Sequence, residues 1–230
     1  MAHQGLKREV IAFFGPPGSG KGTVAQIWQQ RGGVISLSTG SLCRQHIQEQ
    51  TVHGKEFKQL LDKGLLIPDA LMSAMVGDWL IAHKDHEGVI LLDGYPRTAE
   101  QVRQWHEIMV RDMVEFAHRV VLFEISDNVL VDRLCQRLTC SNSRCQKVYS
   151  LTESLSTCLD CGSALVRRHD DEPEVIAQRL NVYAGHKRAL LAACETQGVE
   201  VKIFNVDEVP FKNMFECFLK VLSEKGCVAK

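Results

Sequence analysis

Five short apolar runs divide the chain, and each is separated from the next by a segment long enough to form a helix. The runs are Val10–Phe14, Val34–Leu37, Val89–Leu92, Val120–Ile125 and Val201–Val206. Strands that alternate with helices in this way build a parallel sheet with helices on both faces. Strands covered on both faces are apolar throughout instead of alternating, as these runs are. The pattern predicts an α/β fold around a five-stranded parallel sheet.

Two intervals between the runs are too long for simple crossovers. Thr39–Asp69 carries helical patterns, whereas Leu138–Asp171 is rich in serine, threonine and cysteine. Ligands of parallel sheets bind beyond the carboxyl ends of the strands. We therefore expect both intervals to be insertions over the active face.

Two further helices are expected towards the C-terminus. Pro173 suits the first turn of a helix and the acidic residues 170–172 suit its positive end, so that Arg179 lies well along this helix. The segment Phe211–Leu222 also has an apolar helical pattern. We expect it to pack on the sheet; the alternative is a surface for a partner protein.

A phosphate-binding loop follows the first apolar run. The nine residues GPPGSGKGT, Gly15 to Thr23, lie between that run and a helical pattern that begins near Val24. Glycines let the backbone curl so that successive N–H groups point at anionic oxygens, and the following helix adds the positive end of its dipole. Lys21 supplies a charge for the outer phosphates, and the hydroxyl that usually follows the lysine comes one residue later, at Thr23. The loop predicts that the chain binds a nucleotide.

Candidate chemistry also follows two other strands. Asp93 directly follows the third run, where a carboxylate near a phosphate loop holds magnesium through its water shell; the alternative is an ordinary turn or helix-cap aspartate. Arg44 comes one helical turn after the segment SLSTG, Ser36 to Gly40, and its guanidinium fits an oxyanion with two parallel hydrogen bonds.

Composition narrows the functional classes. The 230 residues carry a formal net charge of −1, which argues against nonspecific nucleic-acid binding because that needs a basic excess. The sequence has no apolar run of about 18 residues that could cross a membrane, and its first ten residues lack the apolar stretch of a secretion signal. We expect a cytoplasmic protein that acts without a membrane or a nucleic acid.

Four of the nine cysteines are clustered in the second insertion. Cys140, Cys145, Cys158 and Cys161 form two close pairs, and four thiolates suit tetrahedral zinc. A reducing compartment disfavours the alternative of disulfides. A nucleic-acid-binding zinc ribbon is disfavoured because Tyr149 is the only aromatic residue between the pairs. The remaining cysteines are expected to be reduced packing or surface residues; they are Cys43, Cys135, Cys194, Cys217 and Cys227.

Taken together, these segments resemble the adenylate kinase family through nearly the whole chain. The matching motifs, in the family's order, are GPPGSGKGT, STGSLCR (Ser38 to Arg44), DGYPRTAEQ (Asp93 to Gln101), VDRLCQR (Val131 to Arg137), RRHDD (Arg167 to Asp171) and Arg179 in AQRL. The resemblance implies a P-loop NTPase-type core of residues 1–37, 68–136 and 172–230. It also implies an AMP-binding insertion of residues 38–67 and a lid of residues 137–171 with a zinc site. Here four residues, instead of two, separate Cys140 from Cys145.

The resemblance also implies roles for individual residues. Lys21, Arg97, Arg133, Arg137, Arg168 and Arg179 are the implied catalytic residues, which surround the transferred phosphoryl group. The implied ATP site consists of Gly18, Ser19, Gly20, Lys21, Gly22, Thr23, Arg133 and Arg137. The implied AMP site consists of Thr39, Gly40, Arg44, Gly94, Arg97, Gln101, Arg168 and Arg179, with Gln101 on the adenine edge. Asp93 and Thr23 are the implied magnesium shell.

The expected activity is reversible, magnesium-dependent phosphoryl transfer from ATP to AMP, giving two ADP, with lid closure excluding water. One alternative is a kinase of another nucleoside monophosphate, or an AMP kinase that uses GTP. Another is a nucleotide-binding regulator that has lost catalysis. Ser41 stands where the family usually has an aspartate, which either weakens metal placement or leaves Asp93 sufficient alone. We expect a monomer that binds ATP, AMP and ADP.

Overall fold

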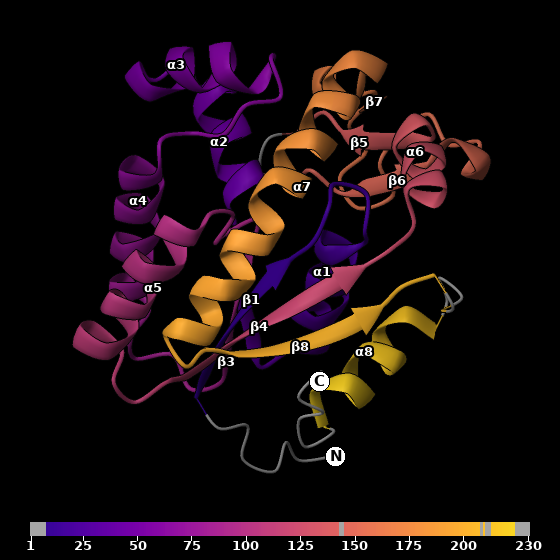
Figure 1. Cartoon of the computed structure of the whole chain (residues 1–230). Coiled ribbons are helices and arrows are strands. Elements are labelled where there is room, and N and C mark those ends of the chain that lie inside the picture. The colour runs from indigo at the N-terminus through magenta and orange to yellow at the C-terminus, as the bar shows by residue number, and fades with distance from the viewer. Residues whose placement is uncertain (1–7, 143–144, 208, 210–212, 224–230) are drawn as a thin grey trace.

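The five apolar runs form a single parallel sheet in the computed structural model, which describes residues 8–142, 145–207, 209 and 213–223. Its strands are β1 (Glu9–Phe14), β2 (Val34–Ser38), β3 (Val89–Asp93), β4 (Ala117–Glu124) and β8 (Glu200–Asn205). They lie in the order β2-β3-β1-β4-β8, and every neighbouring pair is parallel (Figure 1). The predicted α/β fold class is confirmed, although β4 begins three residues before its apolar run.

Helices cover both faces of this sheet. One face is covered by α1 (Lys21–Arg31) and α8 (Met214–Ser223), and the other by α4 (Asp69–Ala82), α5 (Ala99–Asp112) and α7 (Pro173–Thr196) (Figure 1). The short helix α6 (Asp127–Cys135) follows β4. The α8 segment packs on the sheet, as expected, within its described residues; its first two predicted residues, 211 and 212, lie outside them.

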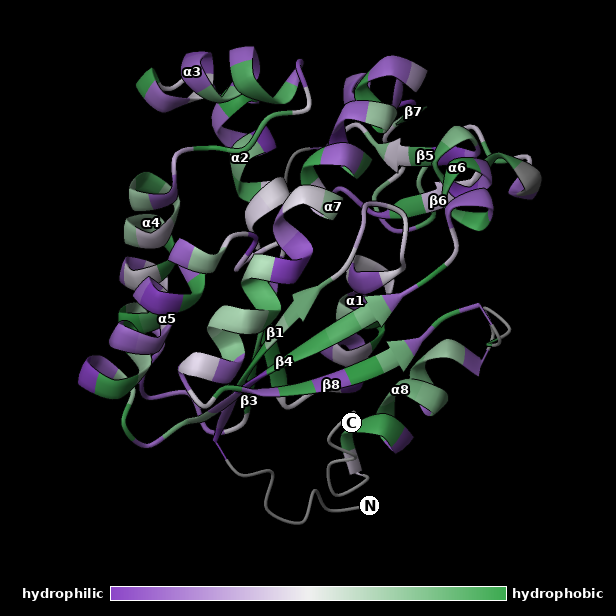
Figure 2. Cartoon of the chain, viewed as in Figure 1, coloured by the Kyte–Doolittle hydropathy of each residue, from purple (hydrophilic) through white to green (hydrophobic). Residues whose placement is uncertain are grey.

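Two cores follow from the alternation of side chains along each strand. In β1, Val10, Ala12 and Phe14 pack in the core beneath α4, α5 and α7, whereas Ile11 and Phe13 pack against α1 and α8. Figure 2 shows the central strands as mainly hydrophobic and the outer helices as mixed or hydrophilic. The sheet is therefore a rigid platform that fixes where its strand ends lie.

Two helix starts test the local predictions. The helix after the phosphate-binding loop begins at Lys21 instead of near Val24, because Gly20 takes a left-handed conformation (φ 93°) and turns the loop directly into the first helical turn. The first turn of the helix is polar, so the apolar pattern used to predict the helix begins only after it. The prediction that Pro173 opens a helix is confirmed by α7.

Both long intervals form additional structure at the carboxyl ends of the sheet strands (Figure 1). The first contains α2 (Thr39–Gln48) and α3 (Val52–Leu61). The second contains an antiparallel sheet of β5 (Arg137–Cys140), β6 (Val148–Ser150) and β7 (Leu165–Val166), with short 3₁₀ turns η1 (Leu151–Glu153) and η2 (His169–Asp171). We call residues Arg137–Val166 the cysteine module. Within the described ranges, no helix combines the length and apolar character needed to traverse a bilayer.

Phe218 of α8 provides a test of the second core. Its side chain is fully buried, and its ring centroid lies 5.4 Å from that of Phe13 and 5.5 Å from that of Trp28. We expect Phe218→Ala to lower the free energy of unfolding by about 3–5 kcal/mol, measured by urea denaturation, because it leaves a cavity. Val114→Ala, at a side chain that is 73% exposed, should change it by less than about 1 kcal/mol. Equal losses in the two variants would contradict this account of the core.

Candidate functional site

A cleft of about 1080 Å³ lies at the carboxyl ends of the strands, between α2, the cysteine module and α7. Most of the predicted site residues line it: Gly18, Gly20, Lys21, Gly22, Thr23, Gly40, Arg44, Asp93, Gly94, Arg97, Arg133, Arg137, Arg168 and Arg179. Ser19, Thr39 and Gln101 are almost fully buried beneath this lining. The structure thus brings residues from six separate segments of the sequence to one cavity.

Lys21 lies within the curl of the phosphate-binding loop. Its Nζ donates to the carbonyl oxygens of Gly15 (2.8 Å) and Pro16 (2.7 Å) and to Oγ of Ser19 (3.0 Å). Burial lowers the pKa of Lys21 to about 7, with nearby Arg97 adding to the effect and Asp93 opposing it. The loop is therefore already shaped around this amine, and an anion bound there favours its charged form.

Asp93 and the glycine after Lys21 lie against each other. A Cβ placed on Gly22 would lie 3.3 Å from Oδ2 of Asp93, so a larger residue would crowd that carboxylate. The hydroxyl of the loop comes one residue later, at Thr23. Oγ of Ser38 donates to the same Asp93 oxygen at 3.4 Å. Carboxylate and hydroxyl oxygens are hard ligands of the kind that magnesium takes, and both Asp93 and Thr23 line the cleft.

Thr39 and Gln101 stabilise the Gly94–Arg97 segment of the cleft wall through buried hydrogen bonds. Thr39 donates its hydroxyl hydrogen to the carbonyl oxygen of Gly94 (2.9 Å). Gln101 accepts from the backbone N–H of Arg97 (2.8 Å) and donates through Nε2 to Oδ1 of Asp69 (2.7 Å). In this conformation both side chains fix the Gly94–Arg97 segment.

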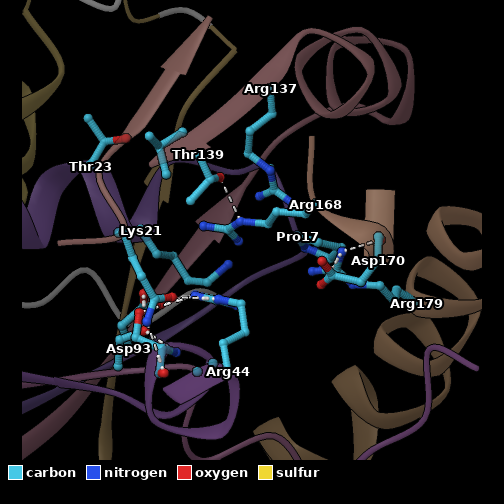
Figure 3. A pocket seen from close by; sticks show the side chains of 18 of the residues that line it. Pro17, Lys21, Thr23, Arg44, Asp93, Arg137, Thr139, Arg168, Asp170 and Arg179 are labelled. Atoms are coloured by element: carbon cyan, nitrogen blue, oxygen red, sulfur yellow. Dashed lines mark hydrogen bonds and ion pairs between the residues drawn. The ribbon is translucent and has the colours of Figure 1, made fainter. Parts of the chain in front are cut away.

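Carboxylates orient two arginines of the opposite wall, and a hydroxyl orients a third. Arg137 pairs with Asp171, its Nε donating at 2.7 Å, and Arg179 pairs with Asp170 at 3.0 Å. Arg168 donates instead to Oγ1 of Thr139, at 2.8 Å (Figure 3). The sequence assigned Asp170 and Asp171 to the positive end of α7; the structure uses them to hold guanidinium groups, and the position before the helix is taken by Glu172, which makes no side-chain cap bond.

Positive charge accumulates in the cleft, where Lys21, Arg44, Arg137, Arg168 and Arg179 converge (Figure 3). Burial lowers the pKa of Arg168 well below its usual value, and Arg44 and Arg137 lower it further. Burial likewise lowers the pKa values of Arg44 and Arg179. Burial opposes ionisation of Asp170, yet Arg179 and Arg168 lower its pKa overall. An anion bound among these cations lowers their mutual repulsion, so the cleft is suited to binding phosphate groups.

Gln146 is a cleft residue that the sequence did not reveal. It lines the cavity from the cysteine module and contacts Arg44 and Ser41 of α2. Its partners lie about a hundred positions earlier, beyond the reach of local patterns. The available signal was its position directly after Cys145, where the second cysteine pair has a glycine, Gly162.

The four clustered cysteines could hold a metal ion. Their Sγ atoms all lie within 4.8 Å of one another, with 3.4 Å between Cys140 and Cys161 and 3.7 Å between Cys145 and Cys158. A tetrahedral zinc ion with Zn–S bonds of about 2.3 Å separates its sulfur ligands by about 3.8 Å. The sulfur atoms are thus placed as zinc ligands and not as disulfides, so the donor set fits zinc.

Tyr149 supports this cysteine cluster. Its hydroxyl accepts from the backbone N–H of Leu159 (3.0 Å) and donates to Sγ of Cys158 (3.3 Å). That hydrogen bond, followed by backbone hydrogen bonds from Asp160 and Cys161, lowers the pKa of Cys158 to about 6 and so favours the thiolate that a metal requires. Outside the cluster, Cys43 and Cys194 are buried, Cys217 is half-buried and Cys135 is exposed; Cys227 lies outside the described residues.

Comparisons with known proteins agree on one family. The family model described as adenylate kinase matches residues 13–199. The adenylate kinase of Chlamydia pneumoniae is 32% identical over 216 residues, which cover 93% of this chain and 99% of that protein. That of Methanothrix thermoacetophila is 33% identical over 215 residues (93% and 98%), and that of Kosmotoga olearia 37% over 177 residues (75% and 80%).

The low pKa of Lys21 predicts that anion binding is coupled to proton uptake. Since a phosphate favours the charged amine, affinity for inorganic triphosphate should be highest below pH 7. It should fall by up to tenfold per pH unit above about pH 7 until the pKa of the bound state is reached. Calorimetric titration in buffers of different ionisation enthalpy measures both the affinity and the protons taken up.

Lys21→Arg is the control for this measurement, because arginine stays protonated and the variant leaves only the titration of the phosphate itself. We expect the variant to lose the proton uptake that is specific to the wild type. Identical pH profiles for the two proteins would show that Lys21 does not titrate in this range.

Proposed function

Because the chain belongs to the adenylate kinase family and is therefore a nucleoside monophosphate kinase, we propose that it transfers the terminal phosphoryl group of ATP to AMP. The reaction is reversible and yields two ADP. The observation that carries this proposal is the convergence of the phosphate-binding loop and the arginines of α2 and the cysteine module on one cleft. The triphosphate of ATP and the phosphate of AMP must meet in one such cavity for the transfer.

The chemistry needs positive charge and positioning more than acid or base catalysis. An oxygen of the AMP phosphate attacks the γ-phosphorus of ATP, the bond to the bridging oxygen breaks, and ADP leaves with that electron pair. The transition state is loose, and its charge spreads over the equatorial oxygens of the transferred group. Arg97, Arg133, Arg137, Arg168 and Arg179 are proposed to surround these oxygens, with Lys21 at the donor end.

The two substrates are proposed to occupy opposite ends of the cleft. ATP takes the loop from Gly18 to Thr23, with Arg133 and Arg137 over its phosphates. AMP takes the side of α2, with its phosphate on Arg44 and Arg97 and its base near Gly94. Contact between Gln101 and the adenine edge requires the Gln101 amide to turn away from Asp69, to which it now donates.

Magnesium enters with ATP, and Asp93 and Thr23 are proposed to hold it. A magnesium ion held there would supply positive charge that offsets the charge developing on the phosphate groups. Asp93 serves this role from the carboxyl end of β3, where its carboxylate lies beside Gly22 of the loop. Ser38 steadies that carboxylate through its hydroxyl.

The cysteine module is proposed to carry a structural zinc ion and to act as a lid. Its apolar cluster is small: Tyr149 with Cys140 and Cys158, and a few half-buried neighbours. Zinc contributes apparent binding energies of about 10 kcal/mol or more in small modules of this kind. We propose residues 38–67 and 137–171 as two movable arms on a core of residues 1–37, 68–136 and 172–230. We also propose that the protein is a cytoplasmic monomer.

The test of the proposed reaction is ADP formation from magnesium-ATP with AMP, GMP, CMP and UMP offered separately. We expect turnover with AMP to exceed that with the other acceptors. Faster turnover with another monophosphate would show that AMP is not the preferred acceptor. Thr39 and Gln101, the residues expected to select AMP, contact protein groups in this structure, so the assay tests that alternative directly. ATP binding without turnover on any acceptor would contradict the enzyme and favour the regulator.

Two arginine-to-alanine variants test whether the charge inside the cleft is required for turnover. Arg168→Ala should lower kcat about a thousandfold, as loss of a transition-state arginine does elsewhere. Arg103→Ala, at an exposed arginine of α5 that pairs with Glu100, should leave kcat unchanged. Equal kcat values in the two variants would remove Arg168 from the proposed mechanism.

Metal analysis tests the zinc proposal. We expect about one zinc ion per chain, because four thiolates complete a tetrahedral shell. Cys158→Ser should lose the ion and lower the temperature at which the module unfolds, whereas Cys135→Ser, at an exposed thiol outside the cluster, should keep both. Full zinc content in Cys158→Ser would refute the four-cysteine site.

A further inference from the structure

The two cysteine pairs end in turns that differ in one residue. Cys161 is followed by Gly162 at φ 72°, and Cys145 is followed by Gln146 at φ 47°. Glycine takes this left-handed conformation without steric cost, whereas a residue with a side chain is disfavoured there because its Cβ crowds the backbone. The first turn therefore carries backbone strain that a glycine would remove, and the Gln146 side chain must offset it.

That side chain spans the gap between the cysteine module and α2. Gln146 is 8% exposed. Its Oε1 accepts from Nε of Arg44 at 2.6 Å, and its Nε2 donates to the backbone carbonyl oxygen of Ser41 at 3.1 Å. Both ends of one amide are thus used on the same helix. Such a two-point contact fixes orientation as well as distance.

Arg44 is held by neutral partners alone in this contact. Besides Gln146, Oγ of Ser41 accepts from its Nη2 at 3.1 Å. Neither the amide nor the hydroxyl neutralises the guanidinium charge, in contrast to the carboxylates that pair with Arg137 and Arg179. Asp170 and Asp93 act on Arg44 only through space, and no carboxylate of the described residues pairs with it directly, so its guanidinium is oriented yet open to a phosphate.

We propose that Gln146 is a positioning residue for the acceptor phosphate: it orients Arg44 from the cysteine module and so couples closure of that module to AMP binding. This inference rests on the proposed function, since it assigns the AMP phosphate to Arg44. The strained turn after Cys145 persists because it delivers the amide to α2.

Three variants test the proposal. Gln146→Gly removes the amide and relieves the strained turn, so KM for AMP should rise about tenfold, as for loss of a hydrogen bond to a charged group, while KM for ATP changes less than twofold. Gln146→Glu keeps the size of the side chain but places a carboxylate on Arg44, so KM for AMP should rise further. Gln50→Gly is the matched control, because Gln50 is also a glutamine at positive φ (52°) but is exposed.

A merely structural role makes a different prediction. In that case Gln146→Gly alters thermal stability or zinc content and leaves KM for AMP at the wild-type value, and this outcome would overturn the proposal. A Gln146→Glu enzyme with a lower KM for AMP than Gln146→Gly would overturn it as well, because the neutrality of the contact would then be irrelevant.

Amide hydrogen exchange without nucleotide separates this inference from the proposed reaction. Removing the amide should speed exchange in α2 around Ser41 to Arg44 in Gln146→Gly, but not in Gln50→Gly. Unchanged exchange there would show that the contact does not form, whatever the enzyme turns over. Faster exchange in a protein with no AMP kinase activity would keep the contact and refute only the proposed function.

Discussion

Positive charge gathered in a half-buried cleft is the constraint on which the rest of this structure depends. Lys21 and the arginines of α2, α6, β5 and α7 face one cavity, and burial lowers the pKa values of Lys21, Arg44, Arg168 and Arg179. Removing water from so many cations is unfavourable until anions replace it. The fold tolerates this arrangement because a sheet buried on both faces holds the strand ends rigidly. In addition, Asp170 and Asp171 form ion pairs with Arg179 and Arg137 and so neutralise part of the charge.

The same constraint explains how the cleft is divided. Arg137 and Arg179 are held by carboxylates and Arg168 by the hydroxyl of Thr139, whereas Arg44 on α2 is held by the neutral Gln146 and Ser41. Lys21 is held by backbone carbonyl oxygens of its own loop. The cations are thus fixed by different kinds of partner, and the positive charge left for a phosphate to neutralise differs from one part of the cleft to another.

The sequence predicted the sheet and most of the cleft because these follow from local patterns. Apolar runs mark strands buried on both faces, and the spacing of Gly15 to Thr23 is specific to a loop around phosphate. What it did not predict depends on partners far apart in the chain. Asp171 reaches back 34 positions to Arg137, and Gln146 reaches 102 positions to Arg44. Local spacing carries no information about such pairs, and the acidic run before α7 had an equally good local explanation in the helix dipole.

The pairing of β5 with β7 sets Thr139 opposite Val166, so the chain enters and leaves the cysteine module at neighbouring positions. An insertion whose ends already lie together adds little loop-closure entropy to the fold that carries it. Its four sulfur atoms come from within the module itself. The module is in this sense a cassette: its length and its internal chemistry can diverge over evolution while the parallel sheet beneath keeps its register.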